Sequence, residues 1–218
     1  MYKIQIGVTR FSQESWLENK KWREEHKYNG CIYGVDREIS TKVAYGSKIF
    51  VIEMNNCKNM IMGVGLIHYI NRDDWRRKIY KNGNYNRFCY RGKRRRSREE
   101  LLKKDAQIVK ELEEILFKGS RHFKRGHGIY IIPTKRLGCI YKEKERKKTQ
   151  CGICGMVGHN SRTCSIKKRV VAIHTPTSKR LCKICGKLDK GHICINTKID
   201  FQKIKKIMLF FANLFDKF

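Results

Sequence analysis

The sequence predicts an α+β domain followed by two small zinc-binding modules and a C-terminal amphipathic helix. Three features support this prediction: β-rich apolar runs separated by a turn, a capped apolar helix, and two short clusters of cysteine and histidine. With 218 residues, 40% of them hydrophobic, the chain can bury one ordinary core and carry small appendages. We expect the domain at 1–134, a charged linker at 135–150, zinc modules at 151–164 and 182–194 around a basic linker at 165–181, and the helix at 200–218.

Strand and helix patterns mix in the first domain. The run 2–8 (YKIQIGV) alternates as a strand does, and 12–26 (SQESWLENKKWREEH) has helix-forming composition. Two β-rich apolar runs, 48–54 (KIFVIEM) and 60–68 (MIMGVGLIH), flank the turn-like NNCKN and predict two adjacent strands. The segment 126–133 (GHGIYIIP) predicts a returning strand that ends at a proline.

A capped helix is predicted after a basic segment. Ser97 and Glu100 have the spacing of a capping box, and Gly119 can end the helix. Apolar residues between them recur at helical spacing and predict one buried face. These residues are Leu101, Leu102, Ile108, Val109, Leu112, Ile115 and Leu116.

The segment 200–218 also has the pattern of an amphipathic helix. We expect its apolar side to pack on the protein itself. The alternative is contact with a partner protein or a membrane surface, because Lys203, Lys205 and Lys206 lie beside that side. The expected apolar side comprises Phe201, Ile204, Met208, Phe211 and Phe215.

The stretch 151–164 (CGICGMVGHNSRTC) has almost no large apolar side chains, so burial alone cannot offset the entropy of ordering it. A metal ion can. A CxxC turn directs two sulfurs toward one tetrahedral centre, and the glycines permit the tight backbone. We therefore predict two Zn²⁺ ions, with a cross-braced pair sharing ligands as the alternative. The ligands are Cys151, Cys154, His159 and Cys164 in the first module and Cys182, Cys185, His192 and Cys194 in the second.

The charge of the chain predicts a polyanionic partner. Fifty Lys and Arg residues against twenty Asp and Glu residues give a formal net charge of +30. Six of the ten cysteines lie in the two metal clusters, which is typical of a reducing compartment. The sequence has no long apolar run and no signal-peptide pattern at its start, so we expect no transmembrane segment. The expected location is intracellular, in the cytoplasm, the nucleus or a viral factory, or packaged in a virion.

Three basic patches are candidates for phosphate contact, and for the first the alternative is a localisation signal or a solvated loop. The first surrounds Phe88 and Tyr90 and comprises Arg87, Arg91, Lys93, Arg94, Arg95, Arg96 and Arg98. The second, after the capped helix, comprises Arg121, Lys124 and Arg125. The third lies around the first zinc module and comprises Arg162, Lys167, Lys168 and Arg169.

The first cluster, with GHNSRTC, resembles the CCHC zinc knuckle of retroviral nucleocapsid proteins, of mutator-type transposases and of proteins from large DNA viruses. The resemblance implies binding to single-stranded nucleic acid, DNA or RNA. Nucleocapsid knuckles often stack bases on an aromatic residue just after the first cysteine, where this chain has Gly152. Met156 offers an apolar surface instead and is a candidate contact.

The segments CIYGVDREIS, YGSKIFVIEMN and MIMGVGLI resemble the core of PUA-like folds, particularly the EVE and ASCH domains. The resemblance implies a small β-barrel with flanking helices that binds RNA or a modified DNA base. It makes Trp16, Trp22, Tyr33 and Trp75 candidates for a base pocket, with core aromatics as the alternative.

The acidic residues do not predict a catalytic centre. A metal-dependent nuclease needs carboxylates that converge on Mg²⁺, whereas Asp73 and Asp74 are adjacent and would point apart on a strand. Zinc sites with four protein ligands leave no open position for water. We therefore expect no enzymatic activity but a zinc-dependent nucleic-acid-binding protein of a large DNA virus. The alternative is an adaptor whose zinc modules and C-terminal helix hold partner proteins on nucleic acid.

Overall fold

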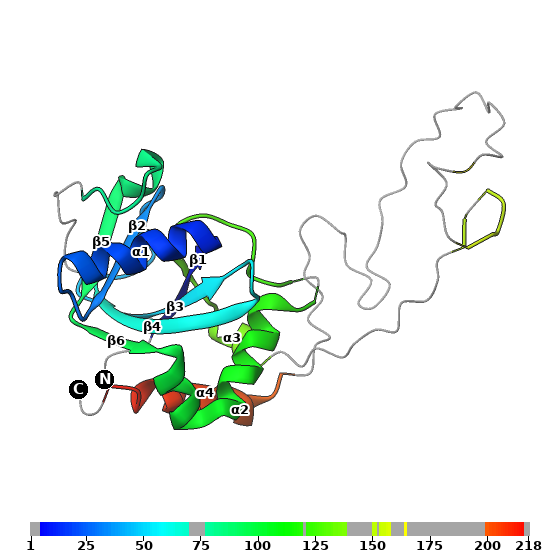
Figure 1. Cartoon of the computed structure of the whole chain (residues 1–218). Helices are drawn as coiled ribbons and strands as arrows, with labels where there is room; N and C mark the ends of the chain where they lie inside the picture. The colour runs from blue at the N-terminus through cyan, green and yellow to red at the C-terminus, as the bar shows by residue number, and fades with distance from the viewer. Residues whose placement is uncertain are drawn as a thin grey trace. The chain divides into compact units, whose positions relative to one another are not determined.

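Figure 1 shows the computed structural model of the chain, which describes residues 5–69, 77–119, 121–138, 150–151, 153–157, 164 and 199–215. The chain divides into two compact units. The first comprises Met1–Tyr141 and Ile199–Phe218, and the second comprises Lys142–Lys198. The segment predicted as a C-terminal helix therefore belongs to the same unit as the N-terminal domain.

A five-stranded mixed sheet forms the centre of the first unit, with strands in the order β6-β4-β3-β1-β7. Strands β1 and β3 pair in parallel, whereas the other neighbouring pairs are antiparallel. The predicted pair at 48–54 and 60–68 is confirmed as β3 and β4. The returning strand predicted at 126–133 pairs over only two residues, as β7. The bounds are β1 Gln5–Phe11, β3 Lys48–Asn55, β4 Met60–His68, β6 Arg94–Ser97 and β7 Tyr130–Ile131.

A second sheet consists of β2 (Cys31–Val35) and β5 (Phe88–Gly92), which pair antiparallel. One residue, Lys93, separates β5 from β6, so the chain passes there from one sheet to the other. Gly65 of β4 allows the two sheets to approach each other closely, because a Cβ atom there would clash with side chains of β2.

The prediction of an α+β fold is confirmed, but the predicted PUA-like β-barrel is not. Among the described residues the two sheets remain open and do not join into a closed barrel. The physical reason is visible in the strand lengths and pairing. Strand β7 ends the large sheet with only two residues, and β5 pairs with β2 rather than with a strand of that sheet.

Helices cover both faces of the large sheet (Figure 1). Alternate residues of β3 point to opposite faces, so Phe50 and Ile52 pack in one core and Ile49 and Val51 in another. Helix α1 (Gln13–Glu25) and the β2–β5 sheet complete the second core. Helices α2 (Arg98–Phe117) and α4 (Phe201–Ala212) complete the first. Two short elements, η1 (Gly83–Asn86) and α3 (Thr134–Leu137), lie in the connections.

Helix α2 begins as the sequence predicts. The Ser97 hydroxyl accepts a hydrogen bond from the Glu100 backbone N–H, and the Glu100 carboxylate accepts one from the Ser97 N–H at 2.7 Å. The predicted apolar stripe is buried apart from Leu102, which is 38% exposed. The helix is kinked at Asp105, where the backbone is non-helical, and the Asp105 carboxylate caps the second half by accepting a hydrogen bond from the Ile108 N–H at 2.9 Å.

Helix α4 packs on the first core, which confirms the predicted docking of the C-terminal segment. Ile207 and Phe211 are fully buried, and the Phe211 ring lies 5.4 Å from that of Phe50. The predicted face is partly wrong, because Phe201 is 75% exposed. Among the described residues, no helix is both long enough and apolar enough to cross a membrane.

Candidate functional site

Three of the predicted zinc ligands come together in the second unit. The sulfur atoms of Cys151, Cys154 and Cys164 all lie within 4.8 Å of one another, with Cys151 and Cys164 buried. Tetrahedral zinc with bonds of about 2.3 Å to sulfur places its ligand sulfurs about 3.8 Å apart, which is compatible with this cluster. The fourth predicted ligand, His159, lies outside the described residues, as does the whole second cluster of Cys182, Cys185, His192 and Cys194.

The local backbone explains why the CxxC spacing gathers these sulfurs. Residues Gln150 and Val157 form a bridge, and the Cys151 N–H donates to the Met156 carbonyl at 2.8 Å. The Gly155 N–H donates back to the Cys151 carbonyl at 2.8 Å, with Gly155 at a φ of +73°, which disfavours any side chain. The turn therefore directs both cysteines of the motif toward one point.

The same turn favours the thiolate form of Cys151. Desolvation by burial acts against the charge, but hydrogen bonds from the backbone of Cys154 and Ile153 and from the Cys154 and Cys164 thiols outweigh it. Together they lower the pKa of Cys151 to about 6. The Ile153 N–H donates to the Cys151 sulfur at 3.5 Å. A thiolate is the form that binds zinc, so the residues present fit a zinc ion.

Three apolar side chains project from the metal-binding turn. Ile153, Met156 and Val157 are 46%, 55% and 50% exposed, respectively. Met156 was predicted as a contact residue on account of its apolar side chain, and it does lie at the surface. The turn thus displays a small apolar surface beside the sulfur cluster, which a nucleobase or a protein can cover.

The first basic patch is not the loop that the sequence predicts. Residues 88–92 and 94–97 are strands: Cys89 and Tyr90 are both buried in the second core, and 94–97 pair with β4. Arg87, Arg91 and Lys93 are exposed.

The remaining arginines of the first patch make contacts within the protein, and their role in phosphate contact stays a prediction. Arg94 donates to the Phe215 carbonyl at 3.0 Å, and Arg98 donates to the Ile61 carbonyl at 2.7 Å. Arg96 forms an ion pair with Glu100 at 2.9 Å. Arg95 is the most deeply placed, with a side chain only 11% exposed.

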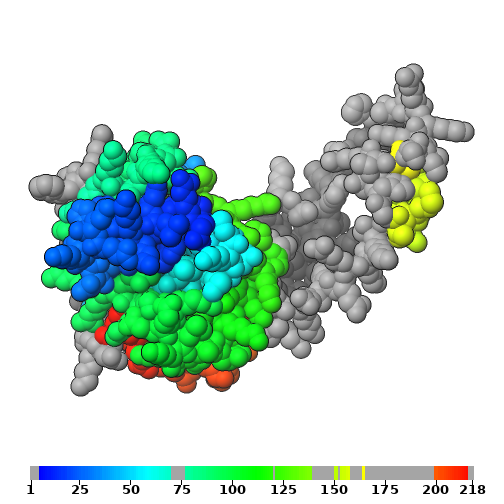
Figure 2. Space-filling view, viewed as in Figure 1, coloured from blue at the N-terminus to red at the C-terminus, as the bar shows by residue number. Residues whose placement is uncertain are grey.

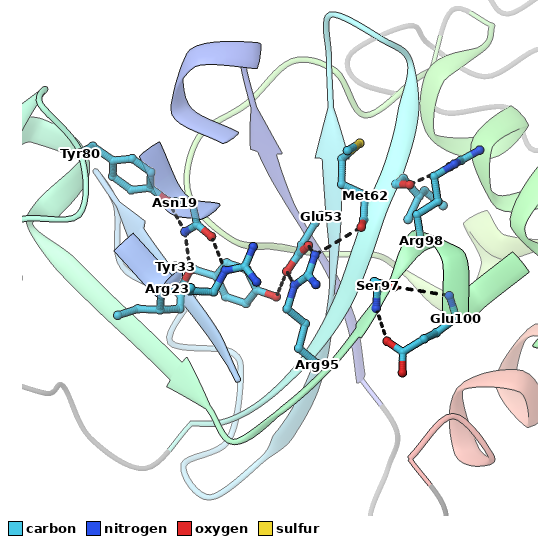
Figure 3. A network of polar contacts seen from close by, with 12 residues as sticks. Asn19, Arg23, Tyr33, Glu53, Met62, Tyr80, Arg95, Ser97, Arg98 and Glu100 are labelled. Carbon is cyan, nitrogen blue, oxygen red and sulfur yellow. Dashed lines mark hydrogen bonds and ion pairs between the residues drawn. The ribbon is translucent and has the colours of Figure 1, made fainter. Parts of the chain in front are cut away.

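Arg95 is fixed by a buried carboxylate, that of Glu53 on β3 (Figure 3). The Arg95 guanidinium donates to both Glu53 oxygens, at 2.9 and 2.6 Å, and the Tyr33 hydroxyl donates to Oε1 at 2.9 Å. Such two-point pairing is the geometry in which a guanidinium and a carboxylate bind most strongly. The sequence contains one signal of this network, the acidic residue in the middle of the apolar run KIFVIEM.

A cleft of about 660 Å³ lies beside this pair, between α1 and the β6–α2 junction. In Figure 2 the blue surface of α1 and the green surface of α2 lie on one face, with the cyan of β4 between them. Trp16, Arg23 and Arg95 line the cleft, and Lys20 and Lys27 also border it. Sequence reasoning missed this cleft, because its residues come from segments far apart in the chain.

The other predicted contacts lie at the surface, in the second core or outside the described residues. Arg121 and Arg125 are exposed, and Lys124 borders a second cavity of about 250 Å³. Trp16, Trp22 and Tyr33 are buried in the second core, although Trp16 also borders the cleft. Outside the described residues lie Trp75, Arg162, Lys167, Lys168 and Arg169.

No family model matches the chain, and searches of curated proteins and of solved structures return no significant match.

Proposed function

We propose that this protein binds nucleic acid without catalysing a reaction on it, holding the phosphate backbone with its cations and flexible or single-stranded segments with its zinc modules. The charge of the chain is the observation that carries this proposal. Even if each of the twenty Asp and Glu side chains were paired with one Lys or Arg, thirty cationic side chains would remain without an acidic partner. A polyanion neutralises such a surplus and releases its own counterions, which provides the free energy of binding.

The cluster of cysteine sulfurs supports the second part of the proposal. The Cys151, Cys154 and Cys164 sulfurs lie close enough to share one ion, with His159 proposed as the fourth ligand. Cys182, Cys185, His192 and Cys194 are proposed to hold a second ion in the same way. Each ion would order a short turn, and the first turn would present Ile153 and Met156 to unpaired bases. The resemblance of this turn to zinc knuckles, including those of large DNA viruses, is consistent with such a role.

Fluorescence anisotropy with labelled oligonucleotides tests this function. The full chain should bind single-stranded DNA, with log affinity falling by about 0.7 per neutralised phosphate for each unit of log salt. Removal of zinc with a chelator should weaken binding, and Met156→Ala should weaken binding to single strands more than to duplex. Matched RNA and duplex probes identify the preferred polymer. Absence of binding to every probe in dilute buffer would reject the proposal.

The alternative function is that of an adaptor, and the exposed apolar side chains Ile153, Met156 and Val157 are the observation that favours it. An adaptor would still bind nucleic acid through its charge, but chelation would leave that binding unchanged. Incubation of plasmid DNA with the protein and Mg²⁺ or Mn²⁺ serves as the check for nuclease activity. Cutting that disappears on substitution of an acidic residue would contradict a role in binding alone.

A further inference from the structure

We infer that the cleft between α1 and the β6–α2 junction binds a phosphate group of the nucleic-acid backbone, and that Arg23 is the residue that holds it. This inference rests on the proposed function and assigns one of its binding sites. The cleft of about 660 Å³ is large enough for a phosphate with its adjoining sugar. Figure 3 shows Arg23 beside the Glu53–Arg95 pair.

Arg23 is held in place by a buried amide. Its Nε donates to the Asn19 side-chain oxygen at 3.1 Å, and Asn19 is only 1% exposed. The Asn19 amide nitrogen in turn donates to the Ile32 carbonyl at 2.7 Å and to the Tyr80 hydroxyl at 3.1 Å. One nitrogen of Arg23 is therefore used for positioning. A guanidinium has further N–H donors, and these remain for a ligand.

Two guanidinium groups share one aromatic ring in this cleft. The Cζ atoms of Arg23 and Arg95 lie 5.7 and 5.5 Å, respectively, from the centre of the Trp16 ring. Both contacts are close enough for a cation–π interaction. Because packing against Trp16 and hydrogen bonding hold both groups in position, little conformational entropy remains to be lost when a ligand binds.

The two arginines differ in how their charges are balanced. Glu53 pairs with Arg95, whereas none of the described carboxylates forms an ion pair with Arg23. Burial lowers the pKa of Arg23, and the positive charge of Arg95 lowers it further, while the negative charge of Glu53 offsets only part of this effect. Of the two acidic residues that border the cleft, Glu24 forms an ion pair with Lys20, and Glu99 lies at the start of α2. An anion beside Arg23 would relieve this imbalance.

A phosphate diester fits this site better than an isolated carboxylate does. Trp16, Tyr28 and Met62 line the cleft beside the two guanidiniums, and they provide contact area for the sugar or base that accompanies a phosphate. Lys20 and Lys27 also border the cleft, where they can contact neighbouring phosphates of the same strand. A planar guanidinium and two flexible ammonium groups together suit the successive phosphates of a phosphodiester backbone.

The test compares Arg23→Gln with Lys21→Gln in the full chain. Both substitutions remove one positive charge from α1, but Lys21 is exposed, pairs with Glu25 and does not line the cleft. Arg23→Gln should weaken binding of a labelled single-stranded oligonucleotide about tenfold relative to Lys21→Gln. It should also lower the magnitude of the slope of log affinity against log salt by about 0.7, as expected for one lost phosphate contact. Arg23→Lys should have an intermediate effect, and it preserves the charge if Arg23→Gln impairs folding.

A second measurement remains informative if no long oligonucleotide binds. Titration with a 5′-phosphorylated dinucleotide, followed by NMR of the arginine Nε–H groups, should shift the signals of Arg23 and Arg95 but not that of exposed Arg37. Equal affinities of Arg23→Gln and Lys21→Gln, with the wild-type chain still binding, would reject this inference and preserve the proposed function. If Arg23→Gln lost more affinity for polyglutamate than for DNA, the cleft would be assigned to an acidic peptide. That result would also reject this inference.

Discussion

Glu53 shows how one residue determines the role of several others. A buried carboxylate is costly unless it is paired and hydrogen-bonded, and Arg95 and Tyr33 meet both conditions. Arg95 is therefore committed to the interior, although it lies in the most basic run of the sequence. Because Glu53 pairs with Arg95, Arg23 is the arginine of the cleft that has no carboxylate partner among the described residues.

The same buried region predicts a loss of stability at alkaline pH. Burial raises the pKa of the Cys31 thiol from its ordinary 9.0 to about 12, and the negative charge of Glu53 adds to the effect. Burial also raises the pKa values of Tyr33 and Tyr80. Between pH 9 and 12 the unfolded chain therefore releases the Cys31 proton while the native chain keeps it. Stability is fully present below pH 9 and should fall by at most about 1.4 kcal/mol per pH unit for each such group.

Urea unfolding measured from neutral to strongly alkaline pH checks this expectation. Cys31→Ala should reduce the slope of unfolding free energy against pH, because it removes one of the titrating groups. Cys57→Ala is the matched control, since Cys57 is exposed. An unchanged slope in Cys31→Ala would show that the thiol does not contribute to the pH dependence.

At the scale of elements, α4 links the end of the described chain to the core of the N-terminal domain. Phe211 of α4 and Phe215, just after the helix, pack on β3, with ring centres 5.4 and 5.9 Å, respectively, from that of Phe50. The apolar face that could have recruited a partner is therefore covered by the protein itself. The helix acts as a structural part of the first unit.

Two substitutions within α4 test this structural role. Phe211→Ala should lower the free energy of unfolding by about 3–5 kcal/mol, because it leaves a cavity where a fully buried ring now packs. Phe201→Ala, the same change at a position that is 75% exposed, should alter it by less than about 0.5 kcal/mol. Urea or thermal unfolding measures both. Similar small effects of the two variants would indicate that α4 does not dock as described.

Local patterns predicted α2 and α4 well but not the segment 88–97. Ser97 and Glu100 form their capping box with neighbours in the sequence, so spacing was sufficient to find it. In contrast, the segment around Arg94 and Arg95 forms a strand because it pairs with β4, about thirty residues earlier in the chain. Charge density alone predicted an exposed loop there.

At the scale of the whole molecule, the chain combines a unit with two apolar cores and a unit in which three thiols meet. Hydrophobic burial stabilises the first, whereas we propose that the second is stabilised by a metal ion. Loss of zinc should therefore affect the two units differently.

Zinc content measured by mass spectrometry tests this separation. Cys154→Ser should lower the content by one ion per chain, and Cys154→Ser with Cys185→Ser should lower it by two if both modules bind zinc. The main thermal transition, which reports the apolar cores, should be unchanged in each variant and after chelation. Cys57→Ser, an exposed thiol outside the cluster, should lose no zinc. An unchanged zinc content in Cys154→Ser would remove the metal assignment.

The sequence by itself determined the α+β class, the strand pair β3–β4, the N-terminal cap of α2 and the spacing of the cysteines, because neighbours within a few residues create these features. It also determined the surplus of positive charge. Only the tertiary structure decided which cations are available to a ligand, because that depends on partners distant in the chain. Arg95 meets Glu53 across 42 residues, and Arg23 reaches the same aromatic ring as Arg95, that of Trp16, only when α1 packs in the second core. Composition records how many charges exist, and folding determines which of them remain without a partner.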